Sequence, residues 1–187
     1  MVSMTALWMP ILVSAVIVFI ASSVMHMMLS YHQTDYRQVP NEDKILAALQ
    51  PFNIPPGDYF VPHGEGMSAL KDPAYLAKIN AGPVAIMTVR PNGPPAMGKS
   101  LVLWFLYAVV VSGMAAYVAG RVLGPGADYL AAFRFAGTTA FAAYAMAHLQ
   151  ESIWTGRAWS TTVKNVFDGL VYALLTGGVF GWLWPSA

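Results

Sequence analysis

The chain has 187 residues, no cysteine and a formal net charge of +1, with 57% hydrophobic and only 10% charged residues. Soluble domains carry roughly 25% charged residues, so this chain has too few charges to cover a water-facing surface. The composition excludes a disordered chain and a disulfide-stabilised secreted fold. Ten Lys and Arg against nine Asp and Glu give no basic excess for nucleic-acid binding. An integral membrane protein remains.

Four apolar segments are predicted to cross a lipid bilayer as helices. The first, residues 5–29, contains no Asp, Glu, Lys or Arg and exceeds the ~20 residues that a span needs. No Lys or Arg precedes it and it lacks an A-x-A site, so we expect it to be retained and not cleaved as a signal peptide. The other spans cover residues 101–120, 129–149 and 166–184. Arg134 interrupts the third span, so three spans are the alternative.

Residues 30–98 form one long polar excursion between spans one and two. Asn41 before EDKILAALQ predicts a capped short helix, and Asp72-Pro73 before AYLAKIN predicts a second one. The β-branched run 84–90 predicts a strand, with residues 58–61 as its partner.

The expected fold is therefore an all-α membrane protein. It is a four-helix transmembrane bundle with a small α+β cytoplasmic excursion between spans one and two. Residues 150–165 are expected to form an interfacial loop between spans three and four.

The distribution of basic residues predicts the orientation. Eight of the ten Lys and Arg lie in loops one and three or at their edges, whereas Arg121 alone lies in loop two and Arg134 lies within a span. Because basic residues concentrate on the cytoplasmic side, we expect the excursion in the cytoplasm and both termini in the periplasm of a bacterial inner membrane. Arg134 is expected to snorkel to the outer headgroups with Asp128 as a neighbour, or to contact a lipid headgroup or partner subunit.

Small residues recur at helical spacing in two spans. Ser112, Ala116 and Gly120 repeat every fourth position, and Gly177 and Gly181 form a GxxxG pattern. Such faces allow helices to approach closely in lipid. They predict packing within the bundle, with an intersubunit contact as the alternative.

Residues 93–100, GPPAMGKS, match the phosphate-loop pattern G-x-x-x-x-G-K-[ST]. Pro94 and Pro95 lack two of the N–H groups that a phosphate cradle needs, and the helix that follows is apolar throughout. We therefore interpret the segment as a polar linker in which Lys99 anchors span two at the headgroups, and we expect no nucleotide binding.

His26, His148 and Asp168 fall near the cytoplasmic ends of three different spans. Histidines on two helices are suited to axial ligation of haem b, and histidine with methionine is suited to copper. This predicts His26 and His148 as candidate cofactor ligands. A metal site would draw on His26, Met25, Met28, His148 and Asp168.

Two other interpretations of these residues stay open. The histidines and the aspartate could satisfy helix ends, where the helix dipole favours a cation at the C-terminus and an anion at the N-terminus. They could also form a proton or ion relay. On the helix-end interpretation we expect no cofactor.

The stretches WSTTVKNVFDGLVYALLTGGVFGWLWP and HMMLSYHQTDYRQVPNEDK resemble those of small bacterial inner-membrane proteins of about four spans, a group without an assigned activity. The resemblance implies membrane localisation alone.

Together these features predict a non-catalytic membrane protein that acts as an accessory or assembly subunit of a larger complex. Its partners would be the lipid bilayer and other membrane subunits or further copies of itself. A haem- or copper-binding electron-transfer protein using His26 and His148 is the alternative, and a small transporter is the third.

Overall fold

The structure of the protein is a computed structural model that describes residues 1–186. The chain is mostly helical, with one two-stranded sheet. It divides into two compact units. The helical unit contains Met1–Tyr36 and Ala96–Ala187, and the excursion unit contains Arg37–Pro95.

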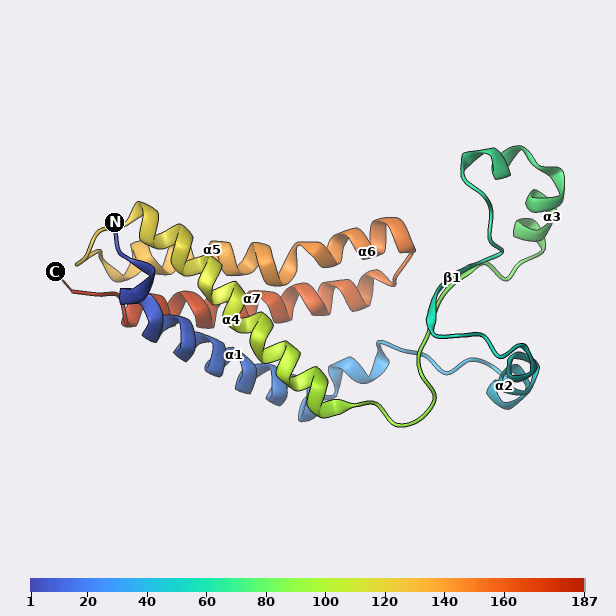
Figure 1. Cartoon of the computed structure of the whole chain (residues 1–187), viewed down its shortest axis with the longest axis horizontal. Helices are drawn as coiled ribbons and strands as arrows, with labels where there is room; N and C mark the ends of the chain where they lie inside the picture. The colour runs from blue at the N-terminus through green and yellow to red at the C-terminus, as the bar shows by residue number, and fades with distance from the viewer. Residues whose placement is uncertain (187) are drawn as a thin grey trace. The chain divides into compact units, whose positions relative to one another are not determined.

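Four long helices form the helical unit: α1 (Trp8–Met27), α4 (Met97–Val122), α5 (Tyr129–Ala145) and α7 (Trp159–Trp182). Each of α1 and α5 contacts both α4 and α7, so the four helices pack as a ring (Figure 1). A short 3-10 helix, η1 (Met4–Leu7), leads into α1.

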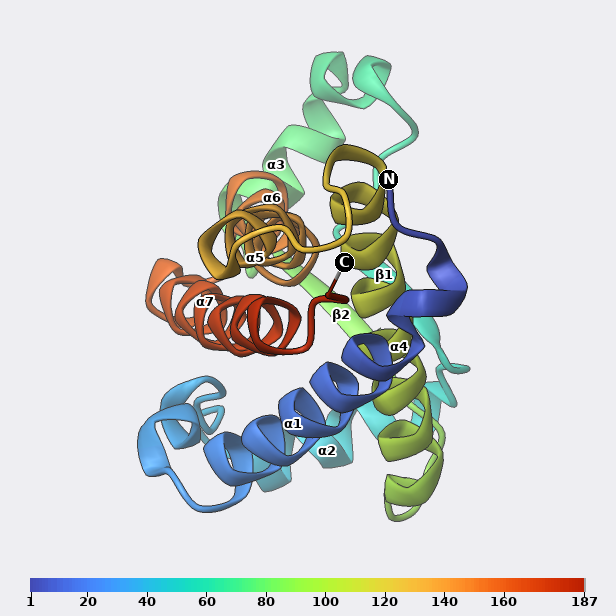
Figure 2. The same ribbon diagram turned by 90° about the vertical axis from the view of Figure 1, so that its left-hand side faces the viewer.

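Segments near both ends of the chain lie beside the turn that joins α4 to α5. The amide of Val2 donates to the carbonyl of Gly120 at 2.8 Å, and the amide of Gly126 donates to the carbonyl of Pro185 at 2.8 Å. Figure 2 looks onto this end of the unit, with both termini in view. The start of α1, the end of α4 and the end of α7 are thereby held together.

Two helices, Met4–Met27 and Met97–Val122, are long and apolar enough to cross a membrane. They correspond to the first two expected spans. The third expected span is a helix of 17 residues that carries Arg134, and the fourth carries Lys164 and Asp168 within its first three turns. Length and composition therefore support two of the four expected spans.

The interior of the helical unit consists mainly of alanine, glycine and hydroxyl side chains. Ser14 donates to Ser112 at 3.0 Å between α1 and α4, and both are fully buried. A Cβ atom added to Gly177 would lie 2.9 Å from the carbonyl oxygen of Phe133, and one on Gly120 would lie 2.8 Å from that of Val2. The small-residue patterns in α4 and α7 thus serve close packing inside the unit.

The helix boundaries near the end of α5 differ from the sequence prediction. The helix ends at Ala145, and α6 (Ala147–Thr155) covers much of the range 150–165 that was expected to be a loop. The connection to α7 is reduced to residues 156–158. Hydropathy alone misses α6 because its contact with α7 is polar: Ser152 and Thr162 are both buried, with their hydroxyl oxygens 2.6 Å apart.

The excursion unit contains two short helices and a hairpin. The helices are α2 (Glu42–Leu49) and α3 (Pro73–Ala81), with the 3-10 turns η3 (Gln50–Phe52) and η4 (Met67–Lys71) beside them. Strands β1 (Gly57–Val61) and β2 (Ala85–Val89) pair antiparallel, with Gly57 opposite Val89, which confirms the predicted strand pair.

The predicted helix caps in the excursion unit have different outcomes. The cap at Asp72 is confirmed, since its side chain accepts from the Ala74 amide at 2.9 Å. The cap at Asn41 is wrong: this residue adopts a left-handed conformation with φ 55°, and its side chain makes no capping hydrogen bond. Its backbone carbonyl instead accepts from the Lys44 amide at 2.9 Å, at the start of α2.

Candidate functional site

The candidate site lies at the end of the helical unit where α1 stops. His26 is in the last turn of α1, and η2 (Ser30–Thr34) follows after a short break. Asp168 lies in the third turn of α7, and its carboxylate faces η2. This residue is only 3% exposed. The site therefore joins two segments that are far apart in sequence.

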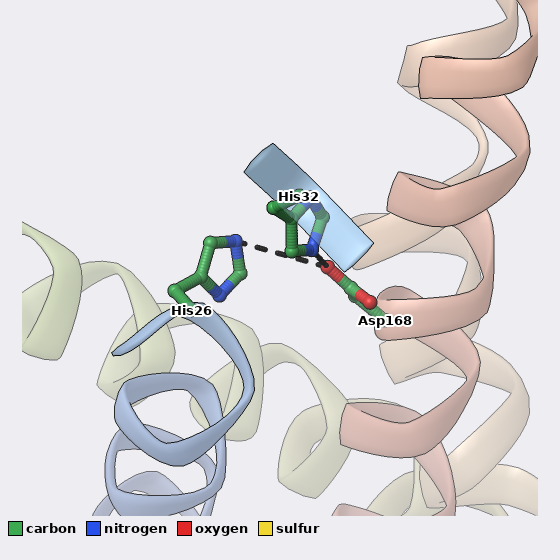
Figure 3. A group of neighbouring side chains, drawn as sticks. All are labelled: His26, His32 and Asp168. Carbon is green, nitrogen blue, oxygen red and sulfur yellow. Dashed lines mark hydrogen bonds and ion pairs between the residues drawn. The ribbon is translucent and has the colours of Figure 1, made fainter. Parts of the chain in front are cut away.

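Asp168 accepts hydrogen bonds on both carboxylate oxygens. The hydroxyl of Tyr31 donates to Oδ1, and Nε2 of His32 lies 2.8 Å from Oδ2. His26 approaches the same Oδ2 atom, with its Nε2 atom 3.8 Å away (Figure 3). Two imidazole nitrogens and one carboxylate oxygen thus converge on one point.

A second layer of contacts holds His32. Its Nδ1 atom lies 2.6 Å from Oδ2 of Asp35, and Lys164 of α7 donates to Oδ1 of the same carboxylate at 2.8 Å. Lys164 also donates to the Tyr31 carbonyl at 2.6 Å and to the Thr34 hydroxyl at 2.7 Å. The ammonium group of Lys164 therefore links both ends of η2, and the residue after it, to α7.

The environment fixes the charge states of two groups outside the long helices. Burial, together with the hydrogen bond to Asp168, raises the pKa of Tyr31 well above its ordinary value, so the phenol stays protonated and acts as a donor. Burial alone would raise the pKa of Asp35, but the hydrogen bonds from Lys164 and His32 outweigh it and lower that pKa. Asp35 therefore stays ionised, and its carboxylate accepts a hydrogen bond from Nδ1 of His32.

The rings of His26 and His32 stack on each other, with centroids 4.3 Å apart and an interplanar angle of 11°. The His26 side chain is 50% exposed, whereas those of His32 and Asp168 are 12% and 5% exposed. His26 therefore forms the solvent-facing side of the site, and the other two groups form its floor.

The structure brings together only part of the predicted site. His26 and Asp168 are in the cluster, but His148 lies on α6, with Nδ1 3.7 Å from Oε1 of Glu151. Met25 is buried in the core of the helical unit and Met28 is 76% exposed. The second histidine beside Asp168 is His32, which the sequence did not identify as a ligand.

The helix-end explanation of these residues needs correction. The prediction began the last helix at residue 166, but α7 begins at Trp159. Asp168 is therefore in the third turn, whereas the helix dipole acts on charges in the first turn. His148 is the second residue of α6 and not the last turn of α5, because the helix breaks at Met146. His26 does lie in a last turn, as expected.

An aromatic cluster lies among α1, α4, α5 and α7. The ring of Tyr172 is 5.5 Å from Tyr144 and 5.9 Å from Trp104, whose indole donates to Ser22 at 2.7 Å. Within residues 1–186, the buried hydroxyls of Tyr144 and Tyr172 have no hydrogen-bond partner.

The phosphate-loop pattern has a strand before it and a helix after it, as the sequence suggested. The strand is β2, whose partner is β1 in an antiparallel hairpin, and Gly98 and Lys99 lie in the first turn of α4. Phosphate loops of this type follow a strand of a parallel sheet.

Asp128, the expected neighbour of Arg134, caps α5 by accepting from the Ala131 amide at 3.0 Å.

Comparison of the chain with protein-family models, curated proteins and solved structures finds no match.

Proposed function

We propose that the protein is a four-span integral protein of the bacterial inner membrane that acts as an accessory or assembly subunit. In this proposal α1, α4, α5 and α7 all cross the bilayer and the excursion unit extends into the cytoplasm. The termini lie in the periplasm. The protein contributes contacts and not catalysis.

The distribution of side chains in the helical unit supports four membrane helices. Exposed apolar side chains form stripes along the helices at intervals of three or four residues. On α1 and α7 they are Leu12, Val16, Ile20, Val24, Val163, Phe167, Leu170 and Leu174. The buried positions include Ser14, Ser22, Ser112 and Thr176. Small and hydroxyl side chains inside with large apolar side chains outside is the pattern of helices that pack in lipid.

The ends of the helices support the same arrangement. Trp8 and Trp182 are exposed at the end where the termini lie, and Trp154 and Trp159 are exposed near the α6–α7 connection. Tryptophan concentrates at both membrane interfaces. The excess of Lys and Arg in the excursion and in the α6–α7 region supports a cytoplasmic location for these segments.

The observation that carries the accessory role is the exposed apolar surface of the excursion unit. It has its own helices and hairpin, yet none of its residues is buried. Ile45, Leu46 and Leu49 lie on one face of α2, and Phe60 pairs with Ile86 across the hairpin; all five are exposed. Large exposed apolar surfaces mark contacts with other proteins or membranes. We infer that a partner subunit covers this surface.

The alternative function, electron transfer through a haem or copper held by His26 and His148, has less support. Haem ligation needs two histidines that face each other across a macrocycle. His26 instead stacks on His32, and His148 lies beside Glu151, which also accepts from Arg157. A transporter function has no specific observation in its favour.

Native electrophoresis of membranes solubilised in mild detergent tests the accessory role. The chain should migrate in one discrete complex heavier than its own 20.2 kDa with bound detergent. Ile45→Ser combined with Leu49→Ser should release it, whereas Lys44→Ser on the opposite side of α2 should not. Crosslinking should yield one defined partner species in fixed ratio. Migration of the wild-type chain as a monomer would contradict the proposal.

A further inference from the structure

The cluster of His26, His32 and Asp168 has the arrangement of a metal site. One ligand atom from each residue lies within 4.8 Å of the others. Bonds of about 2.0–2.2 Å to Zn²⁺ in tetrahedral geometry separate neighbouring ligand atoms by about 3.3–3.5 Å. The distances of Oδ2 of Asp168 from the two Nε2 atoms, 3.8 and 2.8 Å, lie on either side of this range. Each of these two distances is therefore close to the separation that a tetrahedral ion requires.

The hydrogen bonds of the two histidines determine which nitrogen can bind. Nδ1 of His26 lies 3.0 Å from the carbonyl oxygen of Ser22, which only accepts, so Nδ1 carries the proton. Nδ1 of His32 faces the carboxylate of Asp35 and carries the proton for the same reason. In each ring Nε2 is then the nitrogen left to bind an ion, and it lies beside Oδ2 of Asp168. Metal-binding histidines are oriented in this way by a carbonyl or carboxylate on the other nitrogen.

The carboxylate has matching support. The Tyr31 hydroxyl donates to Oδ1 of Asp168, which leaves Oδ2 for the ion. Each of the three ligands thus has its own orienting partner: the Ser22 carbonyl, the Asp35 carboxylate and the Tyr31 phenol. Because half of the His26 side chain is exposed, this side of the site is open to ions from solvent.

A purely ionic interpretation explains less of the arrangement. A doubly protonated His32 between Asp35 and Asp168 would account for its own two contacts. It would not account for His26, whose Nε2 atom approaches the same carboxylate oxygen while its ring stacks on His32.

We propose that His26, His32 and Asp168 bind one divalent first-row transition ion, with Zn²⁺ as the best match to two imidazole nitrogens and one carboxylate oxygen. The site lies at the end of the helical unit from which the excursion departs. An ion there would lock η2 to α7 and so fix the segment that leads into the excursion unit. This goes beyond the accessory role and does not depend on it.

Metal titration of the full chain in detergent micelles tests the proposal, with a non-histidine affinity tag for purification. Zn²⁺ should bind at one ion per chain, and Co²⁺ in its place should give the visible absorption of a four- or five-coordinate ion. His26→Gln and His32→Gln should each weaken binding by more than about 100-fold. Asp35→Asn, which removes only an orienting partner, should weaken it by about 10- to 100-fold.

His148→Gln is the matched control and should leave the affinity unchanged. The melting temperature of each metal-free variant distinguishes loss of a ligand from loss of the fold. If His32→Gln unfolds the protein, the half-exposed His26→Gln decides the matter alone. Absence of stoichiometric binding in the wild type would overturn the proposal. So would wild-type affinity in His26→Gln, or a loss of binding in His148→Gln equal to that in the cluster variants.

Discussion

Nε2 of His32 lies 2.8 Å from Oδ2 of Asp168, although 136 residues separate the two in sequence. This contact joins η2, which follows α1, to the third turn of α7. Together with the bonds from Lys164 to η2, it fixes the segment after α1 against α7. The segment that leads into the excursion unit is therefore hydrogen-bonded to α7.

Lys164→Met should destabilise the helical unit. The change leaves the carboxylate of Asp35, only 8% exposed, without its strongest cationic partner. The loss of this partner from a buried carboxylate costs about 1–3 kcal/mol in the free energy of unfolding. Denaturant titration in mixed micelles measures the loss. The double variant Lys164→Met with Asp35→Asn removes both charges and should recover part of the stability; no recovery would contradict the pairing.

Asp35 should make the stability depend on pH in the acid range. Its folded-state pKa is lowered, so the unfolded state binds a proton first as the pH falls. The stabilisation is present above the ordinary pKa of about 4 and is lost as the pH falls through the lower folded value. The melting temperature of the wild type should therefore fall more steeply below about pH 4 than that of Asp35→Asn. Parallel curves for the two proteins would refute this role.

Gly177→Ala should weaken the contact between α5 and α7. The added Cβ atom would lie 2.9 Å from the carbonyl oxygen of Phe133 and 3.2 Å from Cα of Gly137, and backbone atoms cannot move aside cheaply. A cost of about 1–3 kcal/mol is expected. Gly178→Ala is the control on the same helix, because its nearest contact would be the Tyr129 hydroxyl at 3.7 Å. Equal melting temperatures for the two variants would contradict the packing.

The phosphate-loop pattern should not bind nucleotide. Pro94 and Pro95 remove two backbone donors, and the adjoining sheet is a two-stranded hairpin. Equilibrium dialysis of the purified protein with ATP should detect no saturable binding in either the wild type or Lys99→Ala. Saturable binding that disappears in Lys99→Ala would show that the loop is functional.

Two local sequence features predicted the local structure of the excursion unit correctly. The β-branched run around residue 86 and the Asp72-Pro73 pair predicted a strand and a capped helix, because each depends on neighbouring residues. The boundaries around residues 145–159 were missed. There the helix α6 depends on the contact between Ser152 and Thr162, which hydropathy does not register.

The candidate site could be predicted only in part. His26 and Asp168 were identified because ionisable groups at the ends of apolar segments are rare. His32 was missed because its position depends on η2 turning back toward α7 after Leu29, and that turn is held by Lys164 from a distant helix. Such a long-range contact leaves no local signal in the sequence.

Cysteine labelling tests the central claim, that four helices cross the inner membrane with the excursion in the cytoplasm. The chain contains no cysteine, so single substitutions give a clean background. Ser68→Cys, Pro125→Cys and Ala158→Cys each introduce one exposed thiol, in the excursion, the α4–α5 turn and the α6–α7 connection.

A membrane-impermeant thiol reagent added to intact spheroplasts should label Pro125→Cys alone. Ser68→Cys and Ala158→Cys should react only after the membrane is permeabilised. Labelling of Ser68→Cys in intact spheroplasts would reverse the orientation. Labelling of Ala158→Cys together with Pro125→Cys would show that α5 does not cross the membrane, which would contradict the four-span account.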